Sequence, residues 1–314
     1  MAHNNYQAGA AIEVKDLAKY YGEVRAIDGI SFEVEKGEFF GFLGPNGAGK
    51  TTTVRVLTGI ISPDAGSARV MGHQAGSLEA KQLMGVVPEM ANAYLDLTGW
   101  ENLMLMGELY GVSSGERQER ASGLLRQLEL FPRKDGLVRT YSKGMKQRLI
   151  LCMALISDPR VLFLDEPTSG LDVQSTRLIR RMLQELNRNG KTIFLTTHDM
   201  DEANDLCQRV AIIRKGKVVA IDSPEKIRLA TSNLHSVLVC LDGCIPDEEL
   251  ERLPGVNGLK NHGDKYQLYT DDPGNLVVNL VNHCSGRNVQ IISLSTLAPS
   301  LEDAFLALTG GESQ

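Results

Sequence analysis

The sequence predicts an α/β fold followed by a smaller α+β domain, and three patterns lead to this prediction. An apolar, strand-like run at residues 39–43 leads into the glycine-rich segment 44–52, which a helix-like run follows. A continuous apolar run at residues 161–164 is typical of a parallel strand covered on both faces. Residues 237–294 read as strands and helices in the order βαββαβ, which is a ferredoxin-like arrangement.

Length and composition indicate a globular protein of two domains. The 314 residues suffice for one domain of about 200 residues and a smaller second one. A formal net charge of -6 argues against a nucleic-acid partner held by a broad basic face. The five cysteines are odd in number and lack the spacing of zinc ligands, which indicates reduced thiols in a cytosolic compartment.

The sequence also indicates whether the chain itself could enter or cross a membrane. Residues 1–10 are polar, carry no secretory signal and read as a flexible tail. An uninterrupted apolar run of about 18 residues, as a transmembrane helix requires, occurs nowhere in the chain. If the protein works at a membrane, another polypeptide must therefore provide the spans.

The segment 44–52 has the pattern of a phosphate-binding loop, G-x-x-x-x-G-K-[ST]. Such a loop turns backbone N–H groups and the positive end of the next helix toward an anion. Lys50 adds a charge suited to the β- and γ-phosphates, and Thr51 adds a hydroxyl for Mg²⁺. The candidate nucleotide-binding residues of this loop are Gly44, Pro45, Asn46, Gly47, Ala48, Gly49, Lys50, Thr51 and Thr52.

The elements that flank the loop can be read in order. Residues 12–14 and 30–34 alternate as half-buried strands and predict an antiparallel lead-in. Tyr21 lies at the turn between them, where its ring would either pack on the core or stack on a nucleotide base. Residues 52–57 form a helix that Gly59 ends, and a short strand follows at residues 67–71.

A helical insert is expected from about residue 90 to residue 158. Two capping-box patterns, Thr98 with Glu101 and Ser113 with Glu116, open its first helices. Ser142 is placed as the N-cap of a later helix. The residues alone leave two interpretations of that helix start, a cap with cationic flanks or a second anion site.

Two acidic residues follow the apolar run 161–164, at the end of a strand where ligands bind in open α/β sheets. Asp165 is suited to hold Mg²⁺ or its water, and Glu166 can orient and deprotonate an attacking water. Asp172 ends a tight turn and caps the next helix. His198 ends a further buried strand at residues 191–197, where it could donate to a γ-phosphate.

The first domain is expected to span residues 11–231 and the second residues 232–314. The second domain contains no catalytic constellation. Its last helix, residues 300–308, carries an apolar stripe that is expected to pack within the domain.

These motifs, in this order, resemble those of the ATP-binding subunits of ABC transporters from residue 12 to about residue 230. The loop 44–52 is similar to the Walker A loop, Asp165 and Glu166 to Walker B with its catalytic glutamate, and His198 to the switch histidine. Tyr21 is similar in place to the aromatic residue that stacks on adenine. Further similarities are the Q-loop at Glu89, the signature at residues 142–148 and the D-loop at residues 169–172.

At two positions the sequence departs from the family pattern, and these departures indicate one branch of the family. Glu89 stands where the Q-loop has glutamine, a position that the family uses for Mg²⁺ and the attacking water. The signature Leu-Ser-Gly-Gly-Gln is Tyr141-Ser142-Lys143-Gly144-Met145 here, which keeps the serine and the second glycine. Both departures, and the final helix, resemble the daunorubicin-resistance-type branch, whose partners are ABC-2 type exporter permeases.

The resemblance implies an α/β P-loop ATPase core with an antiparallel β portion and a helical insert, and ATP and Mg²⁺ as its cofactors. It implies a head-to-tail dimer, either homodimeric or heterodimeric, in which ATP lies between Lys50 of one copy and Ser142, Gly144 and Asp172 of the other. The chain would then lie on the cytoplasmic face of the membrane, bound to a permease, and export is favoured over import.

Two alternatives belong to other classes of protein. A soluble ABC-type ATPase could act as a mechanical clamp on ribosomes or DNA, but such proteins usually carry two cassettes or long coiled-coil arms. A phosphate-loop GTPase would have an Asn-Lys-x-Asp motif. The sequence has none of these features.

Overall fold

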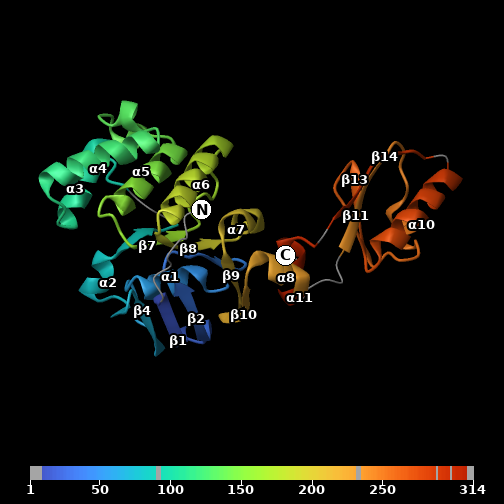
Figure 1. The fold of residues 1–314 in the computed structure, drawn as a ribbon, viewed down its shortest axis with the longest axis horizontal. Coiled ribbons are helices and arrows are strands. Elements are labelled where there is room, and N and C mark those ends of the chain that lie inside the picture. The colour runs from blue at the N-terminus through green and yellow to red at the C-terminus, as the bar shows by residue number, and fades with distance from the viewer. Residues whose placement is uncertain (1–8, 90–92, 231–234, 288, 298, 310–314) are drawn as a thin grey trace, which may run out of the picture. The chain divides into compact units, whose positions relative to one another are not determined.

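The computed structural model describes residues 9–89, 93–230, 235–287, 289–297 and 299–309 (Figure 1). The chain divides into two compact units, with the boundary between Asp222 and Ser223. Most of the tail predicted at residues 1–10, the start of the helical insert at Met90 and the domain boundary expected at residues 231 and 232 lie outside the described residues.

The centre of the first unit is a six-stranded sheet in the order β10-β9-β3-β8-β7-β6. All its neighbouring strands are parallel except β10, which pairs antiparallel with β9. Every residue of β3, β7 and β8 is buried, as the continuous apolar runs predict. The strands are β3 (Phe39–Leu43), β6 (Met84–Val87), β7 (Val161–Asp165), β8 (Thr192–Thr197), β9 (Arg209–Arg214) and β10 (Lys217–Asp222).

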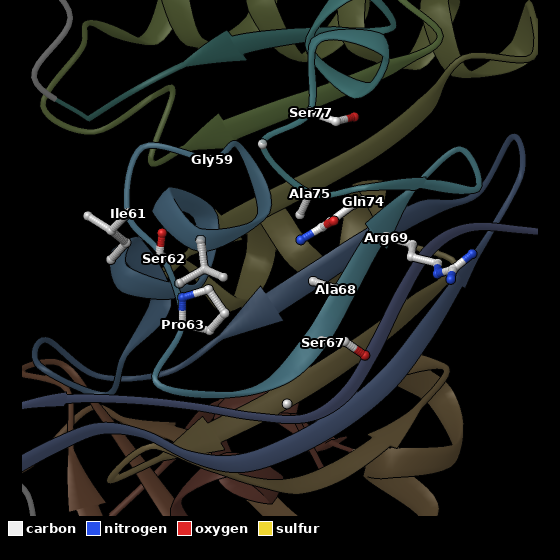
Figure 2. Close-up of a pocket in the computed structure, with 13 residues that line it drawn as sticks. Gly59, Ile61, Ser62, Pro63, Ser67, Ala68, Arg69, Gln74, Ala75 and Ser77 are labelled. Carbon is white, nitrogen blue, oxygen red and sulfur yellow. The ribbon is translucent and has the colours of Figure 1, made fainter.

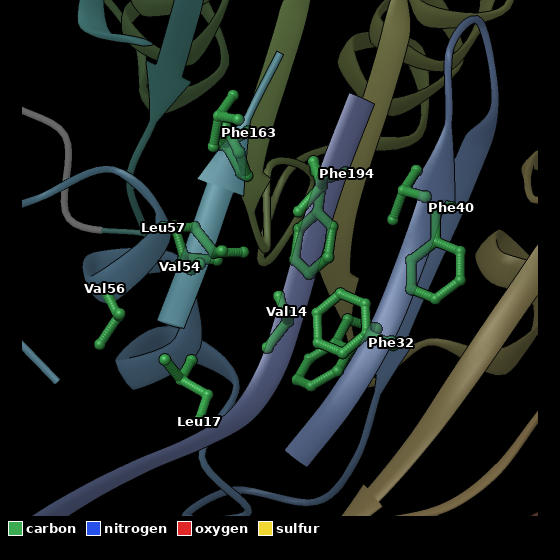
Figure 3. Packing of buried hydrophobic residues seen from close by; sticks show 14 of the residues in the cluster. Val14, Leu17, Phe32, Phe40, Val54, Val56, Leu57, Phe163 and Phe194 are labelled. Carbon is green, nitrogen blue, oxygen red and sulfur yellow. The ribbon is translucent and has the colours of Figure 1, made fainter. Parts of the chain in front are cut away.

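A second sheet, in the order β2-β1-β4-β5, is antiparallel throughout. Its strands are β1 (Ala10–Tyr21), β2 (Val24–Glu35), β4 (Ala65–Val70) and β5 (His73–Gln74), and α1 (Lys50–Leu57) follows β3. Aromatic rings join the two sheets, with Phe194 of β8 at their centre (Figure 3). Its ring centroid lies 5.5–6.1 Å from those of Phe32, Phe40, Phe42 and Phe163.

The predicted helical insert contains α3 (Gly99–Leu109), α4 (Ser114–Gln127) and α5 (Lys143–Leu155), with short 3₁₀ turns at Phe131–Arg133 and Val138–Thr140. The capping box predicted at Thr98 and Glu101 is present. The one predicted at Ser113 and Glu116 is not, because the Ser113 hydroxyl donates to the Glu116 carboxylate, 3.3 Å away, and caps no backbone N–H. The remaining helices of this unit are α2 (Leu78–Gln82), α6 (Val173–Arg188) and α7 (Met200–Leu206).

The second unit contains a four-stranded sheet in the order β12-β13-β11-β14, with every neighbouring pair antiparallel. Side chains of α9 and α10 complete its core, together with Val237, Val239 and Leu268. The last helix, in which Leu301 and Ala304 are buried, packs against α8, and α8 accordingly belongs to this unit. The elements are α8 (Pro224–Ala230), β11 (His235–Leu241), α9 (Asp247–Glu251), β12 (Gly258–Asn261), β13 (Lys265–Thr270), α10 (Pro273–Gly286), β14 (Ile291–Leu297) and α11 (Leu301–Thr309).

Candidate functional site

The phosphate loop connects β3 to α1, and glycine is required at its tightest point. Gly49 is the N-cap of α1 with φ +111°, and a Cβ atom there would lie 2.3 Å from the carbonyl oxygen of Ala26. Ala48 N–H donates to the Pro45 carbonyl, 3.1 Å away, and closes the turn. Pro45, Asn46 and Gly47 remain exposed. A Cβ atom on Gly47 would meet nothing within 4 Å, so its side of the loop is open to a ligand.

Lys50 is folded back over this loop and is only 5% exposed. Its Nζ donates to the carbonyl oxygens of Gly44 and Pro45, at 2.7 and 3.3 Å. The same atom lies 3.4 Å from Oε1 of Glu166. The structure therefore brings together two candidates that lie far apart in the sequence, a cation for phosphates and a carboxylate.

Glu166 follows the last residue of β7 with φ +49°, a left-handed conformation that costs a non-glycine residue roughly 1–2 kcal/mol. Its backbone N–H donates to the Thr196 carbonyl on β8, 3.0 Å away, which holds this conformation in place. The second carboxylate oxygen, Oε2, lies 3.0 Å from Nδ1 of His198. His198 is 56% exposed on its other side, so this ring faces both the carboxylate and solvent.

Asp165 is the last residue of β7 and is buried. The hydroxyl of Thr196 donates to its Oδ1 atom. The donor set of the site is of the kind that Mg²⁺ takes, because a carboxylate and the hydroxyl of Thr51 are hard oxygen ligands. Mg²⁺ is usually held by one or two protein groups together with phosphates and water. In the described ranges, no group of three or more His, Cys, Asp or Glu side chains could hold a metal ion.

Glu89, the third residue predicted for metal binding, lies just after β6 and is exposed. Strand β6 pairs with β7, so Glu89 and Asp165 lie at the same end of neighbouring parallel strands. Within the described residues, Glu89 makes no hydrogen bond or ion pair with Thr51 or Asp165.

A second group of predicted residues lies where α5 and α6 begin. Ser142 caps α5 by accepting from Met145 N–H, 3.2 Å away, and Asp172 caps α6 by accepting from Ser175 N–H, 2.8 Å away. The hydrogen bonds that Asp172 accepts from the backbone N–H and the hydroxyl of Ser175 lower the pKa of its carboxyl group below the ordinary value. A Cβ atom on Gly144 would lie 2.3 Å from the Ser175 hydroxyl oxygen, so the two helix starts are in close contact.

Lys143, which replaces a glycine of the signature pattern, connects these two helix starts. Its Nζ donates to the Ser169 carbonyl, 3.0 Å away, in the turn before α6. Sequence reasoning did not single out Lys143, although its departure from the signature was visible. In the described part of the chain, neither Ser142 nor Gly144 makes a hydrogen bond with the phosphate loop.

Tyr21 ends β1 with its side chain 49% exposed, and Lys19 Nζ lies 5.8 Å from its ring centroid. This exposure argues against a ring packed into the core, which would be covered, and stacking on a nucleotide base stays a prediction. One face of the ring is thus accessible at the end of the strand.

A cavity of about 830 Å³ lies elsewhere in this unit (Figure 2). It is lined from the end of α1 to Ser77 and includes Arg69 and Gln74, but none of the predicted site residues. The phosphate loop, Glu166 and His198 lie instead directly after the carboxyl ends of β3, β7 and β8, which is where open α/β sheets bind their ligands.

Comparison with known sequences identifies a family and relatives that match nearly the whole chain. Residues 27–169 match the family model described as ABC transporter. The Nod factor export ATP-binding protein I of Paraburkholderia xenovorans (strain LB400) is 40% identical over 308 residues, which is 97% of this chain and 99% of that protein. The linearmycin resistance ATP-binding protein LnrL of Bacillus subtilis (strain 168) is 34% identical over 313 residues, 95% of this chain and 98% of that protein.

Solved structures agree in fold. The structure of an ATP-binding subunit of an ABC transporter has a TM-score of 0.66 and 30% sequence identity, covering 70% of this chain and 93% of that one. A dimeric ATP-binding cassette in a post-hydrolysis state, bound to ADP and Pi, has a TM-score of 0.62 and 26% identity, covering 68% of this chain and 98% of that one. The chain therefore belongs to the ABC transporter family, as an ATP-binding subunit that hydrolyses ATP.

Proposed function

We propose that this chain hydrolyses ATP to power export of a substrate through a separate integral membrane permease. Two relatives that match nearly its whole length are named for export and for resistance to linearmycin. No helix in the described ranges is long and apolar enough to cross a bilayer. In this proposal the permease supplies the transmembrane path, and the chain lies on the cytoplasmic face of the membrane.

Within the site, Lys50 and the N–H groups of residues 44–52 would bind the phosphates of ATP, and Tyr21 would stack on the base. Thr51 and Asp165, with Glu89 at the neighbouring strand end, would hold Mg²⁺, which neutralises phosphate charge when bound. Glu166 would orient a water and accept its proton, and His198 would hold this carboxylate and donate to the γ-phosphate. The contacts of Glu166 with Lys50 and His198 support these roles.

The helix start at α5 would bind ATP held by a second copy. Its first turn contains no acidic residue, and its free N–H groups and positive dipole suit an anion. Because Ser142 makes no hydrogen bond with the phosphate loop of its own chain, a head-to-tail dimer would place Ser142, Gly144 and Asp172 against the ATP of the partner. The dimeric cassette of similar fold supports this arrangement.

We infer a ferredoxin-like topology for the second unit. Its connectivity is βαββαβ, and the order β12-β13-β11-β14 places the first and third strands side by side in the middle. This unit contains none of the proposed phosphate, metal or base residues. We therefore assign it to assembly with the permease or to regulation.

The observation that carries the proposal is the placement of Glu166 between Lys50 and His198 at the end of the phosphate loop. The test is to purify the chain together with the integral membrane protein that binds it and to reconstitute both in proteoliposomes. We expect the membrane protein to stimulate hydrolysis and Glu166→Gln to slow it about 10²- to 10⁴-fold. Hydrolysis unchanged by any membrane partner would contradict a role in transport and favour a soluble clamp.

A further inference from the structure

Glu202, on α7, places a second carboxylate next to the segment that follows Glu166. The side chain of Glu202 is 0% exposed. Its Oε1 accepts from the Thr168 hydroxyl at 2.7 Å and from Arg180 Nε at 3.2 Å. Its Oε2 is buried and has no hydrogen-bond partner among the described residues.

Arg180, on α6, extends this hydrogen-bond network from Glu202 to Asp199. Its terminal nitrogen NH2 donates to Oδ2 of Asp199, 2.9 Å away. Asp199 in turn caps α7, because its Oδ1 accepts from Glu202 N–H at 3.0 Å. The Arg180 guanidinium therefore donates hydrogen bonds to two carboxylates, those of Glu202 and Asp199.

These contacts connect the two loops that hold the catalytic pair. Thr168 lies two residues after Glu166, and Asp199 directly follows His198. Thr168, Glu202, Arg180 and Asp199 thus link the backbone next to Glu166 with the backbone next to His198. The contact between Glu166 and His198 closes the ring.

Stability alone does not account for this arrangement. A buried ion pair gains little over apolar side chains of the same size, because both charges lose their hydration. A buried carboxylate oxygen without a donor adds to the cost. A directional link between two loops is something that apolar side chains do not provide, since their contacts carry no fixed geometry.

We propose that Glu202 is a positioning residue for ATP hydrolysis, which holds the Thr168 and Asp199 segments so that Glu166 and His198 stay in contact. This inference rests on the roles proposed for Glu166 and His198. Glu202 itself touches neither nucleotide nor water in the reaction. Its loss should therefore lower kcat and leave the binding of ATP at the phosphate loop intact.

The sharpest test exchanges Thr168. Thr168→Val keeps the shape of the side chain and removes the hydroxyl that donates to Glu202, whereas Thr168→Ser keeps the hydroxyl. We expect Thr168→Val to lower kcat by about 10- to 100-fold, the effect of a small misplacement of reacting groups, with KM and the calorimetric Kd for ATP unchanged. Thr168→Ser should recover most of the activity.

Arg180→Lys provides a second measurement with a matched control one residue away. Lysine presents a single ammonium and cannot reproduce the two directed contacts of the guanidinium, so kcat should fall. Arg181 is exposed on the same helix, and Arg181→Lys should match the wild type.

Two results would overturn the proposal: a wild-type kcat for Thr168→Val, or a loss in Thr168→Val that appears only as weaker ATP binding. Glu166→Gln, measured in parallel, tests the proposed function separately. If that variant hydrolyses ATP at the wild-type rate, the roles proposed for Glu166 and His198 are wrong, independently of the result for Thr168→Val.

Discussion

The Nζ atom of Lys50 lies 3.4 Å from Oε1 of Glu166, so the cation predicted to bind phosphate is also the countercharge of the carboxylate predicted to be the base. Both side chains are largely buried. Ion pairs in such positions respond strongly to loss of one partner, because the other charge is left without compensation. Removing either charge should therefore lower the stability of the fold as well as the function of the residue that is lost.

Lys50→Ala should remove most ATP binding. The phosphates lose a charge-assisted donor worth about 1.5–3 kcal/mol, which corresponds to a roughly 10- to 150-fold weaker affinity. Isothermal calorimetry measures this, with Lys81→Ala on α2, which is exposed, as the control. The unfolding temperature should also fall, since the Gly44 carbonyl and Glu166 lose a partner. Wild-type affinity for ATP would contradict the role of the loop.

Glu166→Gln should keep ATP binding and slow hydrolysis about 10²- to 10⁴-fold, because glutamine can orient a water but accepts no proton. An ATP-bound dimer should then accumulate, which size-exclusion chromatography with and without ATP would detect. If the variant turns over at the wild-type rate, another group is the base, and His198 is the next candidate.

Gly49→Ala and Gly47→Ala should differ in stability although they lie two residues apart. An alanine at position 49 meets the Ala26 carbonyl and adopts φ +111°, so unfolding free energy should fall by at least about 2 kcal/mol. At position 47 there is space, and only the backbone strain of about 1 kcal/mol remains. Denaturant titration followed by circular dichroism compares the two. If both variants lose the same unfolding free energy, the close approach of residue 49 to the Ala26 carbonyl does not limit stability.

Ser142→Arg should abolish hydrolysis and leave ATP binding to the monomer nearly intact, because the blocked contact belongs to the opposing copy. Loss of the cap should cost about 1 kcal/mol of stability. The informative measurement mixes Ser142→Arg with Lys50→Ala protein. One composite site then contains both defects and the other contains neither, so activity should partly recover. No recovery at any mixing ratio would contradict a head-to-tail dimer.

A chain that ends at Asp222 should fold and bind ATP. It should also self-associate less than a chain that ends at Ala230. Helix α8 packs against α11, so a chain that keeps α8 alone exposes the buried side of that helix. Binding by calorimetry and the oligomeric state of both chains would be measured. If residues 1–222 fold but do not bind ATP, the second unit contributes to the nucleotide site.

Much of this protein could be predicted from its sequence, because the information is local. The loop between β3 and α1, the caps at Thr98, Ser142 and Asp172, and the buried strands each depend on residues close together in the chain. Apolar runs and cap patterns are set by backbone geometry and burial, which a short window of sequence reflects. The capping box predicted at Ser113 was wrong because the two side chains bond to each other instead.

Only the tertiary structure decided which of these segments meet. The pairing of Lys50 with Glu166, the left-handed backbone of Glu166 and the packing of α11 on α8 join residues far apart in the chain. The same holds for Glu202, which in sequence is one acid among several on a short helix. Its burial and its bonds to Thr168 and Arg180 exist only once three separate segments pack together, and no local pattern encodes that packing.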